Sequence, residues 1–191
     1  MRIKTLISLM LISLAPSFSF AVSSTGPGGI KYNLEPIVGF ETTYRNTPTP
    51  HTSTRAIYGA RATAGVDLLM GELEYTKGSD TKTFSTAPES VKNTDEKAKL
   101  GIRSTYHFNS YLFISGRLGG QATKNIREET NGGVVTITEP PIKYHPYAGA
   151  SLGLRFGSVA SISLGTTMIF KDSKDPSKND VQNTVSARFG F

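Results

Sequence analysis

The sequence contains no cysteine among its 191 residues. Disulfide bonds, thiolate metal sites and thiol catalysis are therefore excluded. Beyond Ala21 the chain also lacks any run of 18 apolar residues, so it should contain no membrane-spanning helix. A chain without such a helix crosses a bilayer only as a closed β-barrel, whose backbone hydrogen bonds are all made between strands.

The N-terminal residues have the composition of a secretory signal peptide. Arg2 and Lys4 give a basic start, residues 6–20 are largely apolar, and small residues precede a cleavage point after Ala21. The apolar stretch is too short for a spanning helix and is interrupted by Pro16. We therefore predict that residues 1–21 are removed on export.

The remaining charge is modest and dispersed. Loss of Arg2 and Lys4 lowers the basic count from 21 to 19 against 15 acidic residues, which leaves a net charge of +4. The basic residues do not gather into one run, so no nucleic-acid partner is expected. No clustered histidine and carboxylate motif is present, so neither a metal nor a cofactor is predicted.

From Pro36 onward the sequence divides into eight segments in which apolar and polar residues alternate, as they do in half-exposed β-strands. The segments are residues 36–45, 57–70, 72–79, 96–108, 111–124, 143–156, 159–171 and 181–191. We predict an all-β protein, an eight-stranded antiparallel up-and-down transmembrane β-barrel over residues 36–191. Residues 22–35, which are rich in glycine, are predicted to be a flexible periplasmic arm.

The connections between these segments alternate between very short and long. The short ones are Gly71, Asn109-Ser110 and Gly157-Ser158, and the long ones are residues 46–56, 80–95, 125–141 and 172–180. Short periplasmic turns and long external loops are typical of outer-membrane barrels. Residues 81–86 and 132–138, inside two long connections, have strand-like composition and are predicted to project beyond the membrane.

Alternation alone does not decide which face points outward, because a soluble lipocalin-like barrel turns its apolar face inward around a ligand. Glycines such as Gly101 and Gly119 share the parity of the charged residues, and a narrow lumen needs small residues beside long charged ones. We therefore assign the apolar face to lipid, including Leu68 and Met70 in the second segment. The soluble ligand-binding barrel is kept as an alternative.

The charged face then lines the lumen. Its predicted members are Glu41, Arg45, Arg61, Asp67, Glu72, Glu74, Lys97, Lys99, Arg103, Arg117, Arg155 and Arg188. An eight-stranded barrel is just wide enough for such side chains to fill it. We predict a static network of ion pairs in which Arg103 and Arg117 pair with Glu72 or Glu74.

Aromatic residues are expected to form two girdles at the membrane interfaces. The periplasmic girdle would contain Tyr106, Phe108, Phe156, Phe189 and Phe191, and the outer girdle Tyr44, Tyr58, Tyr75, Tyr144 and Phe170.

The last segment alternates strictly up to Phe189 and Phe191. This ending resembles the last-strand signal by which the outer-membrane assembly machinery recognises barrel proteins. Together with the signal peptide, the eight segments and the loop asymmetry, it resembles the small outer-membrane barrels typified by the transmembrane domain of OmpA and by OmpX. The resemblance implies insertion into the bacterial outer membrane, with its lipids and lipopolysaccharide as neighbours. It also raises a narrow ion or small-solute channel as an alternative function.

Some barrels of this size modify lipid A, so the three histidines are considered as catalytic candidates. His107 falls at a predicted periplasmic turn and His51 in the first long loop, where solvated or capping roles are typical. His145 is predicted near the outer rim, with Glu128, Glu129 or Ser151 as potential neighbours. No nucleophile spacing accompanies it. We predict no catalytic site and no enzyme activity, and expect a structural or surface-interaction protein whose long loops contact partners in adhesion or envelope integrity.

Overall fold

The structure is a computed structural model that describes residues 29–46, 49–85, 87–157 and 160–190. The predicted signal peptide, the first part of the predicted arm and Phe191 lie outside the described residues. Among the described residues, no helix is both long and apolar enough to cross a membrane.

Nine antiparallel strands and one short helix make up the described chain. They are β1 (Lys31–Arg45), β2 (His51–Val66), β3 (Leu69–Thr83), β4 (Ser90–His107), β5 (Leu112–Asn131), β6 (Val134–Thr138), β7 (Lys143–Phe156), β8 (Ala160–Ile169), the 3₁₀-helix η1 (Pro176–Lys178) and β9 (Asp180–Gly190). Their order in the sheet is β4-β3-β2-β1-β9-β8-β7-β5-β6, and the β4–β5 pairing closes the ring. The protein is a closed eight-stranded barrel with one extra strand, β6, as the sequence predicts.

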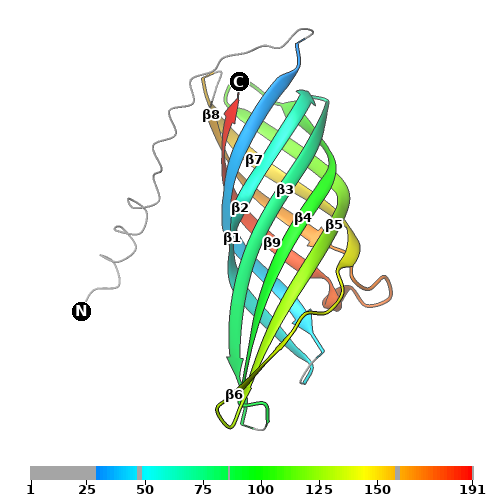
Figure 1. Ribbon diagram of the computed structural model, residues 1–191. Coiled ribbons are helices and arrows are strands. Elements are labelled where there is room, and N and C mark those ends of the chain that lie inside the picture. Colours follow the sequence, from blue (N-terminus) through cyan, green and yellow to red (C-terminus); the bar gives the residue numbers. More distant parts are fainter. Residues whose placement is uncertain (1–28, 47–48, 86, 158–159, 191) are drawn as a thin grey trace, which may run out of the picture.

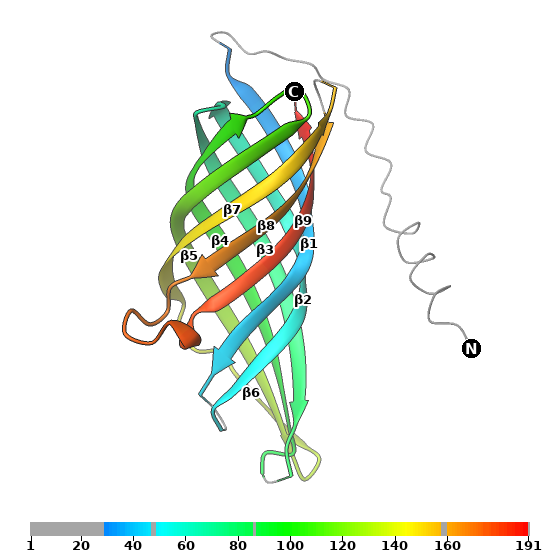
Figure 2. The ribbon, with the colours of Figure 1, turned by 180° about the vertical axis from the view of Figure 1, so that it is seen from behind.

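The barrel has two different ends (Figure 1). One carries the short connections and the start of β1 and end of β9, and we call it the turn end. The other carries the long connections, and we call it the loop end. At the loop end β3, β4, β5 and β6 extend well beyond the other strands, whereas β7, β8 and β9 stop earlier (Figure 2).

Strand β5 takes part in both the ring and this extension. Residues Leu112 to Thr123 pair with β7, whereas Arg127 to Asn131 pair with β6. The extension is therefore a four-stranded sheet in the order β3-β4-β5-β6, which we call the loop-end sheet. Strand β6 is its edge, and the β5–β6 hairpin confirms the strand expected within residues 132–138.

Strand β7 matches the predicted segment, but β1 begins earlier than predicted. It starts at Lys31, so residues 31–35 belong to the barrel and not to the arm. Pro36 lies inside the extended strand although proline cannot donate to a strand ladder. The β1–β9 register passes from Leu34 to Ile37 and leaves Glu35 and Pro36 unpaired on that side, so the missing donor is accommodated.

The first short connection, between β2 and β3, is also displaced from its predicted position. The turn falls at Asp67 and Leu68, between β2 and β3, and not at Gly71. The lumen-facing residues have odd numbers in β2 and even numbers in β3. Met70 therefore faces the lumen, with 1% of its surface exposed, which corrects its assignment to lipid. Leu68, Leu69 and Met70 are all apolar, so alternation did not locate the change of face.

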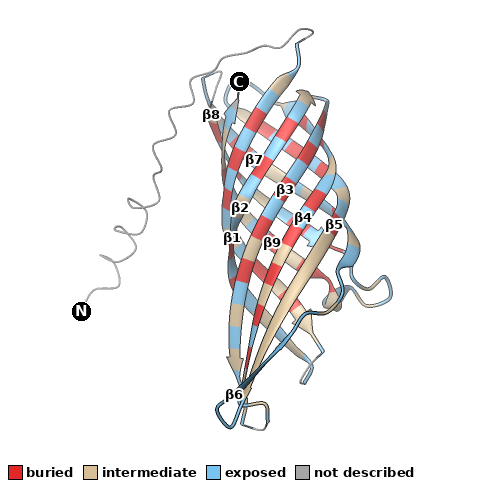
Figure 3. Ribbon diagram, in the orientation of Figure 1, coloured by how far each residue is buried: buried red, intermediate tan, exposed pale blue. Residues whose placement is uncertain are grey.

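Buried and exposed residues alternate along every strand of the ring (Figure 3). The buried positions are mostly polar or charged, and the exposed ones are mostly apolar. Leu100 and Leu164, for example, are 70% and 64% exposed, whereas Lys99 and Arg103 are each 1% exposed. This distribution is the reverse of that in a water-soluble barrel, so the soluble alternative does not fit the structure.

Exposed aromatic side chains occur towards both ends of the outer wall. Those near the turn end are Tyr32, Tyr106, Phe108, Tyr111, Phe156 and Phe189, and those nearer the loop end are Phe40, Tyr58, Tyr75, Tyr144 and Phe170. Tyr106 and Phe108 make an edge-to-face contact with ring centroids 5.3 Å apart. Aromatic residues at these heights are suited to the two membrane interfaces.

Two lumen-facing glycines give large side chains the room they occupy. A Cβ at Gly101 would lie 2.4 Å from the Tyr147 hydroxyl, and a Cβ at Gly153 would lie 2.2 Å from the Phe113 ring. Both distances are far shorter than any real carbon contact. Tyr147 and Phe113 are almost fully buried, at 2% and 1% exposure, so these glycines are required by packing inside the ring.

Candidate functional site: the charged lumen and the loop-end sheet

The lumen charges, most of them buried, form three successive clusters along the barrel. The loop-end cluster contains Glu41, Arg45, Arg55, Asp80, Asp95, Lys97, Lys171 and Asp180. The central cluster contains Arg61, Glu72, Glu74, Lys99 and Arg117. The turn-end cluster contains Glu35, Arg103 and Arg188, with Arg61 joining it to the central one.

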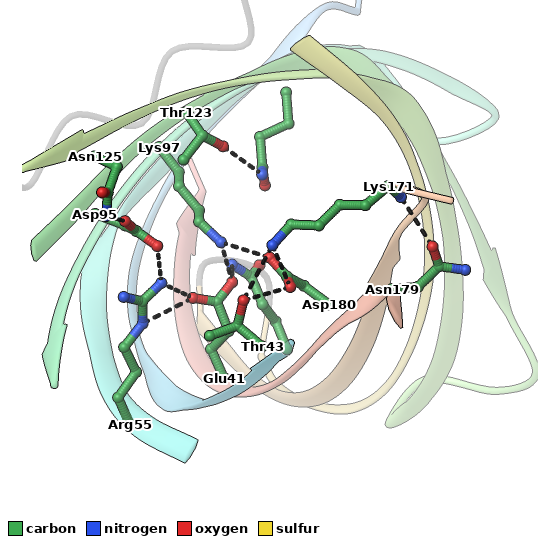
Figure 4. Close-up of polar contacts among 12 residues, drawn as sticks. Glu41, Thr43, Arg55, Asp95, Lys97, Thr123, Asn125, Lys171, Asn179 and Asp180 are labelled. Carbon is green, nitrogen blue, oxygen red and sulfur yellow. Dashed lines mark hydrogen bonds and ion pairs between the residues drawn. The ribbon is translucent and has the colours of Figure 1, made fainter. Parts of the chain in front are cut away.

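The loop-end cluster contains four acidic and four basic residues. Figure 4 shows the part of it around Glu41 and Asp180. Arg55 contacts three carboxylates, with its Nη2 atom 2.5 Å from Glu41 and its Nη1 atom 3.1 Å from Asp80, and it also pairs with Asp95. Lys97 pairs with Glu41 and lies 3.1 Å from Asp180. Every ion of this cluster except Lys171, which pairs with Asp180, therefore has more than one neighbour of opposite charge.

Neutral side chains complete this cluster. The Thr43 hydroxyl donates to Asp180 over 2.5 Å, and the Gln182 amide donates to Glu41 over 2.8 Å. Lys171, which follows β8, reaches Asp180 at 2.6 Å from the loop side. The cluster joins residues of β1, β2, β3, β4 and β9 and of the segment after β8, so it ties opposite walls of the ring together (Figure 4).

The central cluster gathers around two glutamates of β3. Arg61 and Arg117 each lie 2.6 Å from Glu74, and Lys99 lies 2.5 Å from it. Glu72 lies 3.2 Å from Arg117 and accepts a 3.0 Å hydrogen bond from the Tyr147 hydroxyl. Arg117 thus contacts both glutamates, as the sequence suggested.

The turn-end cluster depends on one carboxylate. Glu35 contacts Arg61 and Arg103 at 2.8 Å and Arg188 at 2.7 Å. Arg103 pairs with Glu35, whereas the sequence had suggested Glu72 or Glu74 as its partner. The reason is that β1 starts early enough to bring Glu35 into the lumen, where it is fully buried.

The turn end itself carries a looser group of charges. Lys31 lies 2.6 Å from Asp67, and the His107 Nε2 atom lies 3.6 Å from the same carboxylate. Arg155 donates from Nε to the backbone oxygen of Gly157 over 2.9 Å. These groups are partly exposed, and we call this region the turn-end mouth.

The twelve residues assigned to the lumen from the sequence thus divide among these regions. Eight of them lie in the loop-end and central clusters, namely Glu41, Arg45, Lys97, Arg61, Glu72, Glu74, Lys99 and Arg117. Arg103 and Arg188 lie in the turn-end cluster, and Asp67 and Arg155 lie at the mouth.

Sequence reasoning missed six charged residues of the clusters. They are Glu35, Arg55, Asp80, Asp95, Lys171 and Asp180. All except Lys171 lie in a strand that the prediction began too late or ended too soon. The alternation of Asp180 and Gln182 with their neighbours was the signal that extends the last strand outward.

The three histidines lie in separate places. His51, in β2, stacks edge-on against Phe84 with centroids 5.8 Å apart, and His107 lies at the turn-end mouth. His145 faces Gln121 across the β5–β7 pair, and in the described part of the chain no hydrogen bond joins it to Ser151, Glu128 or Glu129. No group of three or more potential metal ligands occurs in the described residues.

Comparison of the fold with solved structures gives the class of protein. The fold is that of small eight-stranded outer-membrane β-barrels. Neisserial surface protein A matches with a TM-score of 0.57 and 12% identity, over 84% of this chain and 97% of that one. OprG from Pseudomonas aeruginosa matches with a TM-score of 0.55 and 9% identity, over 83% of this chain and 95% of that one.

A third match is Ail, the attachment invasion locus protein of Yersinia pestis, in a complex with the heparin analogue sucrose octasulfate. Its TM-score is 0.53 at 11% identity, over 84% of this chain and 99% of that one. At these identities the likeness establishes the fold. No protein-family model and no curated protein sequence matches the chain.

Proposed function

We propose that the protein is an integral outer-membrane barrel with a structural and surface-interaction role, carried by the loop-end sheet. The observation that carries this proposal is the edge strand β6. Its side chains are exposed throughout, including Val134, Val135 and Ile137 at 67%, 57% and 63%. An exposed apolar edge strand is a ready template for pairing with an extended segment of another protein.

The outer-membrane location is supported by the apolar outer wall and by the named outer-membrane proteins that share the fold. In this placement the turn end faces the periplasm and the loop-end sheet faces outward. The outer wall would contact membrane lipids and lipopolysaccharide, and the last strand with Phe189 and Phe191 would be recognised by the assembly machinery. Cell fractionation with heat-modifiable gel mobility tests the location. A soluble periplasmic band would contradict it.

The lumen is proposed to be closed and non-catalytic. The three buried clusters cross the lumen one after another, which favours a static plug over an open ion channel. The separation of the histidines favours a protein without enzyme activity. Lipid A mass spectrometry with and without His145→Ala tests the second point, and a changed acylation profile would contradict it.

The surface role is tested by binding of intact cells that display the full chain. The probes are immobilised matrix protein extract and immobilised heparin, the latter because a structure with this fold was solved with a heparin analogue. Val135→Lys places a charge on the β6 edge and should reduce binding to matrix proteins at least tenfold. Ser173→Lys, which adds the same charge to another exposed loop, should leave binding unchanged.

Equal binding by wild type and Val135→Lys would overturn the role of β6. Binding to heparin alone, insensitive to Val135→Lys, would also overturn it and would favour recognition by loop charges. Surface protease accessibility must be equal for all variants, so that lost display is distinguished from lost binding.

A further inference from the structure

A small cavity at the turn-end mouth is lined by charged and polar groups that the ion pairs of the lumen do not fully engage. Its volume is about 50 Å³, and Arg155, Ser161 and Arg188 contribute to its lining. These three residues form one row across neighbouring strands, because Arg155 is paired with Ser161 and Ser161 with Arg188. Side chains directly opposite on antiparallel strands are close enough to act on the same ligand.

Positive charge is in excess around this cavity. Among the described residues, Arg155 has no carboxylate within ion-pair distance, and its recorded hydrogen bond goes to the Gly157 backbone oxygen. Arg188 shares Glu35 with two other arginines. Asp67, the carboxylate that lines the cavity, is already engaged by Lys31.

Polar atoms around the cavity also lack partners. The Ser161 hydroxyl and the Nη2 atom of Arg188 are buried, and within the described part of the chain neither has a hydrogen-bond partner. The Ser161 residue is 6% exposed. Buried polar groups in folded proteins are normally satisfied, so an acceptor that belongs to this site is expected to come from outside the chain.

We propose that the turn-end mouth binds a small oxyanion of the phosphate class, held by Arg155, Ser161 and Arg188. Guanidinium groups match the geometry of oxyanions and make strong charge-assisted hydrogen bonds to them. A cavity of about 50 Å³ holds several waters or one small ion, because one water needs roughly 10–15 Å³. The volume suits a small ion, and the position gives access from the turn end.

The experiment is a titration of the full chain in detergent micelles with inorganic phosphate at constant ionic strength, followed by backbone amide NMR. We expect saturable shifts at Arg155, Ser161 and Arg188. Ser161→Ala should weaken binding severalfold, and Arg155→Gln/Ser161→Ala should weaken it at least tenfold. Lys143→Gln, an exposed residue at the loop end, is the matched charge control and should leave binding unchanged.

Linear shifts without saturation, or shifts unaffected by the double variant, would overturn the site and leave a cavity filled by water. Equal shifts with chloride at the same ionic strength would show charge screening alone and would also overturn it. If the double variant lacks heat-modifiable mobility, Ser161→Ala decides the question, because it changes neither the charge nor any recorded hydrogen bond. The result is independent of β6, so it stands or falls separately from the proposed surface role.

Discussion

The two ends of the lumen pair their charges in different ways. At the loop end, Arg55 and Lys97 each contact several carboxylates, so the loss of one acid leaves others in place. Towards the turn end, Glu35 alone is shared by three arginines. The same narrow lumen therefore contains a redundant, charge-balanced network and a network with one essential acid. Burial of charge costs free energy in both, but the consequence of removing one partner should differ.

The largest loss of unfolding free energy is expected for a change in the central cluster, which lies between these two ends. Glu72→Gln/Glu74→Gln leaves Arg61, Lys99 and Arg117 without their central partners. Removing one partner of a buried pair costs about 3–5 kcal/mol, so the double variant should lose at least about 5 kcal/mol of unfolding free energy. Urea unfolding in lipid vesicles measures this loss.

The matched control is Glu128→Gln, the same substitution in the partly exposed pair with Lys92. Exposed pairs contribute about 0–1 kcal/mol. An unchanged melting temperature for the central double variant would contradict the network described above.

The direct comparison of the two ends uses single glutamates. Glu35→Gln should cost about 3–5 kcal/mol, because Arg103 and Arg188 lose their recorded carboxylate partner. Glu41→Gln should cost about 2–3 kcal/mol, as expected for charged hydrogen bonds whose cations keep other acids nearby. Equal losses in paired urea titrations would show that redundancy does not protect the loop end.

A smaller loss of unfolding free energy is expected when a substitution overpacks the central cluster without changing its charge. Gly101→Ala places a methyl group against the Tyr147 hydroxyl, which donates to Glu72. Overpacking of this kind costs about 1–3 kcal/mol. Gly116→Ala, on the outer wall where an added methyl group meets no atom within 4 Å, is the control and should be near neutral.

The smallest effect on stability belongs to an exposed contact in the loop between β8 and β9. Asp175 caps the short helix η1, and the hydrogen bond from Ser177, followed by that from Lys178, lowers the pKa of its carboxyl group. Because the folded pKa is the lower one, the stabilising contribution is present above the unfolded value of about 3.9 and is lost as pH falls through the folded pKa. A carboxyl NMR titration should show the lowered pKa, and Ser177→Ala should raise it again. An ordinary pKa in the wild type would contradict the cap.

The sequence was sufficient to predict the ring because alternation in one strand does not depend on its neighbours. It predicts β7 with its observed bounds, and it assigns Lys99, Arg103 and Arg117 to the lumen. It did not predict Glu35 in the lumen. Proline is typical of a strand end, so Pro36 indicates a boundary in the sequence. The β1–β9 register leaves Glu35 and Pro36 without partners in β9, and this register depends on two strands that are distant in the chain.

The partners of Arg103 were not predictable for a related reason. Periodicity assigns a side chain to a face, but its partner depends on the stagger between strands around the closed ring. Arg103 and Glu35 lie on β4 and β1, which are not adjacent in the sheet. The contact crosses the lumen, and no local pattern records it.

Along β5 the pairing partner changes from β7 to β6, so the residues that close the ring differ from those that pair with the edge of the loop-end sheet. The ring is closed by the pairing of Leu112 to Thr123 with β7 and by the pairing of β5 with β4, whereas β6 pairs with Arg127 to Asn131 alone. Residues 132–138 therefore contribute nothing to the closing ladder. This hairpin tip is a natural insertion point, where a foreign peptide or a substituted loop would leave the closing ladder of the barrel intact.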